Sequence, residues 1–238
     1  AIADGRIGHL GFSFHDSTDV FKEIVDAHDW TFCQIQHNYM DIEYQAGTKG
    51  LRYAASKGLA VVIMEPLLGG QLVDPPQQIE ELWDTAAVKR KPADWALQWL
   101  WNQPEVSLVL SGMSAMQHVE ENCRSAAASG VGTLSADELE MIAQVRSVYQ
   151  ELGPIPCTDC KYCLPCPSGV KIPSILNTYN EGVMYEDPEG AKASYAWLEE
   201  GQRADKCTEC LECEEVCPQS IPITEWLKKA HAQFGSEA

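Results

Sequence analysis

The sequence has no hydrophobic run long enough to cross a membrane. A membrane-spanning helix needs about 20 apolar residues, whereas the longest apolar stretches, such as GLAVVIMEPLL (58–68), are far shorter and carry proline or charge. The opening residues, AIADGRIGHLG, also lack the basic start and apolar stretch of a secretory signal peptide. We therefore expect a cytoplasmic protein without a membrane partner. Because the opening has no initiator methionine and leads almost directly into a strand, we expect it to be cut from a longer chain.

Basic residues are scarce. Lys and Arg total 17 against 35 Asp and Glu, which gives a net charge of −18. Such a field repels nucleic acids and anionic lipids, and no basic run in the sequence compensates for it. The composition therefore predicts a well-solvated acidic surface, or a surface that meets a basic protein partner.

The sequence also lacks the common glycine-rich phosphate-binding motifs. Neither G-x-G-x-x-G nor G-x-x-x-x-G-K-[S/T] occurs, so a dinucleotide-binding fold of that kind and a P-loop have no support. Hydrophobic residues make up 45% of the 238 positions, which is enough for a sizeable core. The length predicts one large domain, or one domain with a smaller one beside it.

Cysteine, by contrast, is abundant, and its placement argues against disulfides. Eight of the ten cysteines fall into two tight clusters, CTDCKYCLPCP (157–167) and CTECLECEEVCP (207–218), while Cys33 and Cys123 stand alone. Cysteines that are separated by only two residues cannot all find distinct disulfide partners within one cluster. A secreted disulfide scaffold is also smaller and spreads its cysteines. The pattern therefore predicts intracellular metal binding.

The second cluster has the spacing of the bacterial run that binds a [4Fe–4S] cluster, C-x2-C-x2-C-x3-C-P. Three closely spaced cysteines reach one cube, and in two-cluster proteins each run lends its last cysteine to the other cube. We therefore predict two [4Fe–4S] clusters, one held by Cys157, Cys160, Cys163 and Cys217 and the other by Cys207, Cys210, Cys213 and Cys166. The first run has two residues, not three, before its last cysteine. We interpret this as a variant, because Cys166 serves the opposite cluster.

Zinc is the main alternative to iron–sulfur clusters as the metal that these cysteines bind. Typical four-cysteine zinc sites use two C-x-x-C pairs separated by a longer loop, whereas here C-x-x-C-x-x-C occurs twice, each time followed by a cysteine and a proline. The spacing favours iron–sulfur clusters. Electron relay is the function that we predict for them, and the alternative is that they only stabilise a small domain.

Residues 1–152 alternate between strand and helix signals. The sequence predicts strands at 7–14, 31–40, 59–67 and 106–113, and helices at 17–29, 47–58, 92–103, 114–128 and 135–150. The run 59–67 is almost wholly apolar, as in a parallel strand buried on both faces, and Ser135-x-x-Glu138 is a capping box. Four strand–helix units amount to half of an eight-stranded barrel, and an open sheet is the alternative. Between the cysteine runs, 172–185 and 190–203 are predicted helices.

Four strings resemble the fifth to eighth strands of the aldo/keto reductase barrel: LGFSFH (10–15), CQIQHNYMD (33–41), IMEPLLGGQL (63–72) and SGMSAMQHVEEN (111–122). The cysteine runs and the helical segment between them resemble the iron–sulfur branch of that family, with its α-helical 4Fe–4S ferredoxin-type module. The resemblance covers about residues 7–233. It implies an α/β fold in which 1–152 form half of a TIM-type (β/α)8 barrel and 153–238 form a dicluster ferredoxin-like domain.

The resemblance also implies a nicotinamide cofactor, NAD(P)H, across the C-terminal mouth of the barrel. By position, the nicotinamide carboxamide is held by Ser13 and Gln34, and Met64 stands where many members stack an aromatic ring on the nicotinamide. The pyrophosphate is covered by Leu67, Gly69 and Gly70. The adenosine end is met by Gly112, Met113, His118, Glu121 and Asn122. Many members have basic residues at that end for the 2′-phosphate of NADP. Here His118 is the only basic residue of the set, so this segment alone does not predict NADP.

The family's catalytic Asp, Tyr, Lys and His come from its first four strands, which do not precede Ile7. No catalytic residue is therefore assigned, and we interpret His15 and His37, near strand ends, as structural. We expect a fragment of a longer protein or one piece of a split barrel. Its exposed edge would pair with the missing N-terminal half or with a second copy.

Two functions follow from these observations. The first is an oxidoreductase that reduces a small carbonyl substrate with NAD(P)H and uses two [4Fe–4S] clusters to exchange electrons with a redox partner protein. Nicotinamide transfers two electrons at once and does not readily pass them singly to clusters without a flavin between, but no flavin motif is evident. The second is a non-catalytic electron carrier whose half-barrel serves as a docking platform.

Overall fold

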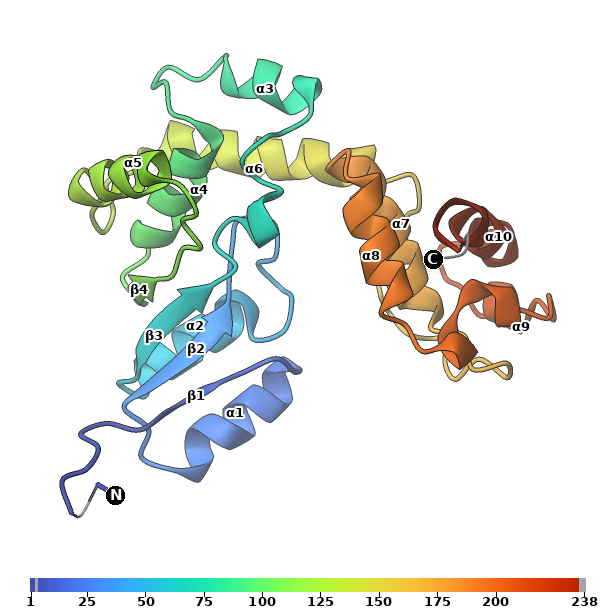
Figure 1. Cartoon of the computed structure of the whole chain (residues 1–238), viewed down its shortest axis with the longest axis horizontal. Coiled ribbons are helices and arrows are strands. Elements are labelled where there is room, and N and C mark those ends of the chain that lie inside the picture. Colours follow the sequence, from blue (N-terminus) through green and yellow to red (C-terminus); the bar gives the residue numbers. More distant parts are fainter. Residues whose placement is uncertain (3, 236–238) are drawn as a thin grey trace. The chain divides into compact units, whose positions relative to one another are not determined.

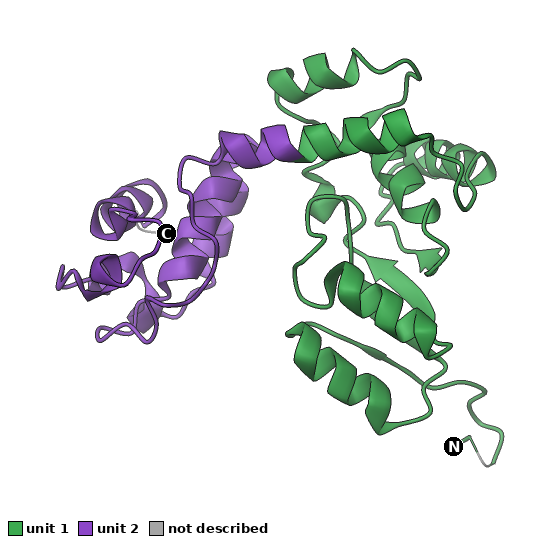
Figure 2. Cartoon of the chain, turned by 180° about the vertical axis from the view of Figure 1, so that it is seen from behind, with its two compact units in different colours: residues 1–146 green, residues 147–238 purple. Residues whose placement is uncertain are grey.

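The computed structural model describes residues 1–2 and 4–235 and separates the chain into two units, Ala1–Arg146 and Ser147–Ala238 (Figure 2). In order along the chain, the first unit contains β1 (Gly11–Ser13), α1 (Thr18–Ala27), β2 (Phe32–Gln36), α2 (Gly47–Ser56), β3 (Ala60–Met64), the 3-10 turn η1 (Leu68–Gly70), α3 (Gln77–Trp83), α4 (Pro92–Trp101), β4 (Val106–Val109) and α5 (Met116–Ala127). The helix α6 (Ala136–Leu152) begins in the first unit and ends in the second.

The four strands form one parallel sheet in the sequential order β1-β2-β3-β4 (Figure 1). Cys33 of β2 pairs with Phe12 of β1 and with Val61 of β3, and Val61 pairs in turn with Val106 of β4. Helices connect successive strands, so all four carboxyl ends lie at the same edge of the sheet. The predicted α/β fold with a parallel sheet is confirmed.

One face of this sheet carries the core of the first unit. Side chains alternate along β2 and β3, and Cys33, Ile35, Val61 and Ile63 are fully buried. They join Phe14, Phe21, Val25, Ala46, Leu51, Ala54, Leu59 and Leu100 in one apolar cluster. The prediction that 59–67 is buried on both faces is wrong: Ala60, Val62 and Met64 are half-buried, because the core residues of α1 and α2 pack on the face that carries Val61 and Ile63.

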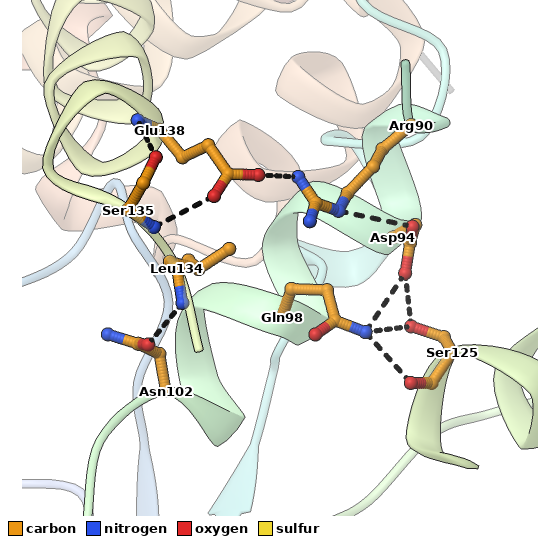
Figure 3. Close-up of polar contacts among 8 residues, drawn as sticks. All are labelled: Arg90, Asp94, Gln98, Asn102, Ser125, Leu134, Ser135 and Glu138. Atoms are coloured by element: carbon orange, nitrogen blue, oxygen red, sulfur yellow. Dashed lines mark hydrogen bonds and ion pairs between the residues drawn. The ribbon is translucent and has the colours of Figure 1, made fainter. Parts of the chain in front are cut away.

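A polar network joins the start of α4 to α5 and α6 (Figure 3). Arg90, two residues before α4, donates to the carboxylate of Glu138 on α6. The buried amide of Gln98 donates to the backbone oxygen of Ser125 on α5 at 2.8 Å. The capping box is confirmed, since Glu138 N–H donates to Ser135 Oγ at 3.2 Å and Ser135 N–H donates to the Glu138 carboxylate at 2.8 Å. The start of α6 is thus fixed both by its own cap and by Arg90.

The second unit is helical, with α7 (Ile172–Met184), α8 (Pro188–Ala196), the 3-10 turns η2 (Glu200–Gln202) and η3 (Ala204–Lys206), α9 (Glu212–Glu215) and α10 (Ile223–Phe234). Its core is formed by Ile155, Val170, Ile172, Ile175, Leu176, Ala191, Tyr195, Ala204, Ile221, Ile223, Leu227, Ala230 and Phe234. Tyr195 links three elements through its hydroxyl, which accepts from Ala204 N–H at 2.9 Å and lies 2.9 Å from His231 Nδ1. Within residues 1–2 and 4–235, no helix has the length and apolar character needed to span a bilayer.

Four helices differ from the sequence-based expectation. The helices α3, α9 and α10 were not predicted, and the helix predicted at 190–203 starts earlier, at Pro188, and stops at Ala196. Its start is set by the Asp187 side chain, which accepts from Gly190 N–H at 2.8 Å. Past Ala196 the chain turns into η2 and η3, so the predicted helix beyond that point is wrong.

We predict that His37 makes stability depend on pH. Its ring is fully buried and lies 5.0 Å from the Trp99 ring. Burial lowers the pKa of His37 from 6.5 to about 4; nearby Gln103 opposes this shift in part, although neither ring nitrogen of His37 has a hydrogen-bond partner among the described residues. The unfolded chain therefore binds the proton first, and stability present above pH 6.5 is lost as the pH falls toward 4.

The measurement is the free energy of unfolding between pH 7 and pH 4. The wild type should lose up to about 3 kcal/mol more than His37→Gln over this range. The matched control is His15→Gln, because His15 is exposed. Equal pH slopes for the wild type and His37→Gln would contradict the prediction.

Candidate functional site

The first group of predicted site residues stands on adjacent strands of the sheet. Ser13 ends β1, Met64 ends β3, and Gln34 lies between them on β2. The Gln34 amide nitrogen is 3.5 Å from Ser13 Oγ and 3.5 Å from Met64 Sδ. The sheet register therefore brings these three side chains together, close to the carboxyl edge where ligands bind in parallel α/β folds.

A cavity of about 620 Å³ opens beyond β3 and β4. This volume lies in the range of small-molecule and cofactor sites. Its lining includes nine of the predicted cofactor residues: Met64, Leu67, Gly69, Gly70, Gly112, Met113, His118, Glu121 and Asn122. Glu65, Pro66, Val73, Ala93, Leu110 and Ser111 complete the lining. Ser13 and Gln34 do not line this cavity, but Gln34 contacts Met64, which does line it.

The loop after β3 shapes one wall of this cavity through an unusual backbone. Gly69 and Gly70 have φ of 66° and 99°, and Glu65 and Leu68 also have positive φ, at 55° and 49°. Glycine adopts such angles without steric cost, whereas other residues do so at a cost that is usually found at functional sites. The Glu65 carboxylate holds the turn by accepting from Gly69 N–H at 2.6 Å.

A buried side chain that the sequence reasoning missed supports the same loop. Asn38, fully buried after β2, donates to the backbone oxygen of Glu65 at 3.1 Å and accepts from Asp41 N–H at 2.8 Å. Asp41 in turn accepts from the Gln36 amide at 2.6 Å. Burial raises the pKa of Asp41, while the hydrogen bonds from Gln36 and Asn38 oppose that shift. In the string QHNYMD (36–41), the polar residues at the end of β2 and directly after it are the local signal for this network.

The opposite wall is held by the segment from β4 to α5. Asn122 donates to Ser111 Oγ at 3.0 Å, which ties α5 to the end of the strand. Glu121 accepts from Lys91 Nζ at 2.6 Å and from the Gln117 amide at 2.8 Å. These two partners, Lys91 first, lower the pKa of Glu121. Lys91 was not among the predicted site residues.

In the second unit, the predicted metal ligands surround two separate hollows. One is lined by Cys157, Cys160, Cys163 and Cys217. The other, of about 140 Å³, is lined by Cys163, Cys166, Cys207, Cys210 and Cys213. Each hollow thus includes three cysteines of one run and the last cysteine of the other run, and Cys163 lines both hollows.

The two cysteine loops repeat each other in conformation as well as in sequence. Two and four residues after the first cysteine, Asp159 and Lys161 have φ of 50° and 64°, and the equivalent Glu209 and Leu211 have 57° and 65°. Left-handed geometry at four residues that are not glycine costs free energy, so it points to a functional constraint on both loops. In the second loop, Glu209 N–H donates to Cys207 Sγ at 3.4 Å.

The chemistry of these hollows suits soft metal ligands. Apolar side chains such as Leu176, Ile223 and Leu227 complete the walls. Burial raises the pKa of Cys157 and Cys163, and raises the pKa of Cys213 to about 11. Free thiols at these positions would thus resist ionisation, whereas a bound metal deprotonates its coordinating thiols. The donor set of each hollow therefore fits an iron–sulfur cluster.

Residues 1–147 match the model of the aldo/keto reductase family, and residues 156–221 match a 4Fe-4S dicluster domain. The chain therefore belongs to the aldo/keto reductase family, and it carries a 4Fe-4S dicluster domain after the reductase-like part. The likeness to iron–sulfur reductases of this family that the sequence suggested is confirmed.

Individual proteins are similar to this chain over part of their length. An uncharacterized oxidoreductase of Schizosaccharomyces pombe is 28% identical over 123 residues, which cover 52% of this chain and 38% of the relative. Subunit alpha 1 of the acetyl-CoA decarbonylase/synthase complex of Methanosarcina acetivorans is 32% identical over 83 residues, 34% of this chain and 9% of that protein. The holo form of an aldo-keto reductase from Bacillus halodurans superposes with a TM-score of 0.51 at 20% identity, covering 60% of this chain and 52% of that one. The chain thus spans about two fifths of the yeast relative and about half of the solved reductase.

We predict that Asn180 anchors the first cysteine loop. Its side chain accepts from Ile155 N–H at 3.0 Å and donates to the Ile155 backbone oxygen at 2.7 Å, two residues before Cys157. A side chain on Gly153 would come within 3.2 Å of Asn180, so glycine there permits the close approach. Asn180→Leu leaves the buried Ile155 N–H without a partner, whereas the Ile155 backbone oxygen still accepts from Cys157 N–H at 2.8 Å, so we expect a cost of about 2 kcal/mol.

The measurement is the unfolding free energy of the iron-loaded chain, together with the rate at which the chain loses iron to a chelator. Asn180→Leu should lower the first and raise the second. Asn177→Leu is the control, because Asn177 is on the same helix but exposed. If both variants behave alike, Asn180 is not the anchor.

Proposed function

We propose that this chain is part of an oxidoreductase that uses NAD(P)H to reduce a small carbonyl substrate and that exchanges electrons through two [4Fe–4S] clusters. The observation that carries the proposal is the convergence of nine residues, chosen by family resemblance alone, on one cavity of about 620 Å³. These residues come from two segments more than 40 positions apart, after β3 and after β4.

In this proposal the cavity and the neighbouring strand ends hold the nucleotide. When bound, the reduced nicotinamide supplies the hydride that the carbonyl carbon accepts. Ser13 and Gln34 hold the carboxamide, and Met64 lies against the ring in place of an aromatic side chain. The left-handed backbone at Gly69 and Gly70 lets the loop approach the pyrophosphate closely. Asn122, fixed by Ser111, contacts the adenosine.

The proton that completes carbonyl reduction comes, in this proposal, from outside the chain. Family resemblance places the Asp, Tyr, Lys and His of the reaction on four other strands, and we propose that β1–β4 form half of an eight-stranded barrel with them. The sequential order of the parallel strands supports this. The position of β4 also supports it: β4 is an edge strand of the described sheet, and its residue Leu108 is 48% exposed, as expected of an edge that pairs with a further strand.

The two hollows in the second unit support two clusters with exchanged ligands. Each hollow includes three cysteines from one loop and the last cysteine of the other, as the ferredoxin-type pattern requires, although Cys163 lines both hollows. The spacing favours clusters over zinc, because C-x-x-C-x-x-C occurs twice, each time followed by a cysteine and a proline, whereas zinc sites typically use two C-x-x-C pairs separated by a longer loop.

The redox partner that we propose is a protein with a basic docking face. Exposed Tyr162, Leu211 and Val216 border the hollow of Cys207, Cys210 and Cys213. The same loop carries four glutamates between 209 and 215. An apolar patch within an acidic rim suits a partner whose lysines and arginines surround an apolar centre. A partner of this kind also removes the need for direct single-electron exchange with nicotinamide.

We predict that Gly70→Val weakens NADPH or NADH binding about tenfold, equivalent to about 1.4 kcal/mol, because a branched side chain enters the cavity wall where φ is 99°. The control is Gly132→Val, since Gly132 also has positive φ, at 68°, and open space around it, but lies outside the cavity. Binding is followed by cofactor fluorescence on anaerobically reconstituted protein. A wild type with intact clusters that binds neither nucleotide would favour the alternative, a non-catalytic electron carrier.

We also predict that Cys213→Ala removes about half of the bound iron, because one of two clusters loses a ligand. Cys123→Ala should keep all of it, because Cys123 is exposed on α5 and distant in sequence from both runs. Iron and sulfide are measured per chain after anaerobic reconstitution. Unchanged iron in Cys213→Ala would refute the ligand assignment, and zinc in place of iron would refute the clusters themselves.

A further inference from the structure

Each cysteine run of the second unit is followed by a helix, and the two helices line the hollows in matching ways. The helix α7 begins six residues after Cys166, and α10 begins six residues after Cys217. We call a hollow first or second after the run that supplies three of its proposed ligands. The second residue of α7, Pro173, lines the first hollow, and the second residue of α10, Thr224, lines the second hollow. The surroundings of the two proposed clusters can therefore be compared position by position.

One contact of the second hollow has no counterpart at the first. Glu214 directly follows Cys213, and its carboxylate accepts from Thr224 N–H at 2.8 Å and from the Thr224 hydroxyl at 2.7 Å. It therefore holds the first turn of α10, where backbone N–H groups and the helix dipole favour a negative charge. The matching residues of the first half are Leu164 and Pro173, which offer neither a carboxylate nor an N–H to bind one. The wall of the second hollow alone thus has a carboxylate one hydrogen bond behind it.

The other charges of the two loops do not compensate for this difference. Asp159 and Lys161 of the first loop lie 3.7 Å apart, and Glu209 of the second loop pairs with Lys228 at 2.7 Å. Each is an exposed pair of opposite charges, so it contributes little net field. The remaining two glutamates of the second loop are exposed and screened by water. Glu214 is half-buried, and in the described part of the chain it forms no ion pair with Lys or Arg.

We propose that Glu214 makes the [4Fe–4S] cluster of the second hollow the harder of the two to reduce, so that an electron taken up by the second unit comes to rest on the cluster of the first hollow. The inference rests on the two clusters of the proposed function. Reduction adds one negative charge to a cluster, and a half-buried carboxylate nearby disfavours that charge. Leu164, at the matching position of the first loop, has no such effect.

The direction of electron transfer follows from this order. The apolar patch proposed for docking borders the second hollow, so the one-electron donor is the reduced partner protein bound there. The partner is oxidised as the cluster of the second hollow is reduced. The same electron then passes to the cluster of the first hollow, which leaves the second cluster oxidised again. No bond is made or broken and no proton is transferred in either step.

The test is a redox titration of the anaerobically reconstituted full chain, followed by the electron paramagnetic resonance of the reduced clusters. The wild type should show two separate midpoint potentials. Glu214→Gln removes the charge but keeps a side-chain oxygen that accepts from Thr224. It should raise the lower midpoint and leave the higher one in place, which changes the distribution of the electron between the clusters about threefold. This is about 30 mV for one electron, since a tenfold change is about 59 mV. The control is Glu215→Gln, the same change at an adjacent exposed residue, which should move neither midpoint.

The outcomes separate this inference from the proposed function. Coincident midpoints in a wild type that holds two full clusters, a rise of the higher midpoint in Glu214→Gln, or an equal rise in Glu215→Gln would each overturn the inference alone. Iron and sulfide below two clusters per chain in the wild type would refute the clusters, and the inference with them. If Glu214→Gln loses iron, Thr224→Val decides: it keeps the charge but removes one of its two hydrogen bonds, so it should lower the lower midpoint further. An unchanged midpoint in that variant would overturn the inference.

Discussion

The pairing of β3 with β4 determines where the first unit can bind a ligand. Ile63 pairs with Val109, and Leu110 N–H continues the ladder by donating to the Ile63 backbone oxygen at 2.9 Å. This pairing sets the loop after β3 against the segment after β4, although more than 40 residues separate them in the chain. The walls of the cavity are those two segments. A shift in register would separate them and would also turn the half-buried strand residues toward the core.

The second unit reaches its site by a different route. Its proposed ligands lie in two short loops whose local backbone geometry is already alike, with left-handed residues at matching positions. Tertiary structure has to bring only the last cysteine of each run to the other loop, so that Cys217 lies beside the first loop and Cys166 beside the second. The charges on the loops differ, because 207–217 carries four glutamates whereas 157–166 carries one aspartate and one lysine. The two proposed clusters would therefore have equal ligand sets but differently charged surroundings, which is a way to make their reduction potentials differ.

The features that could be predicted from the sequence are those that depend on residues close together in the chain. The apolar run at 59–67, the capping box at Ser135 and the C-x-x-C-x-x-C repeats each depend on neighbours in the chain, and the strand, the helix start and the clustered cysteines are present in the structure. The helix α10, which the sequence analysis did not predict, has a local signal in the apolar spacing of Ile223, Leu227, Ala230 and Phe234. By contrast, the link from Lys91 to Glu121 joins residues 30 positions apart. No local pattern encodes such a contact, because it depends on how α4 packs against α5.

One cavity of the first unit is basic although the chain as a whole is acidic: Lys89, Arg90, Lys91 and Arg124 line a cavity of about 440 Å³. A molecule with a net charge of −18 repels an anionic nucleotide at a distance. At 0.1 M salt that repulsion is largely screened beyond about 10 Å, so binding depends on the charges within one or two side-chain lengths of the ligand. Arg90 sits at the centre of this arrangement without being a ligand: by neutralising Glu138 and approaching Asp94, it leaves the more exposed Lys89, Lys91 and Arg124 to define the local field. An acidic protein can thus bind a polyanion, provided that its few cations are placed together and its nearby carboxylates are already paired.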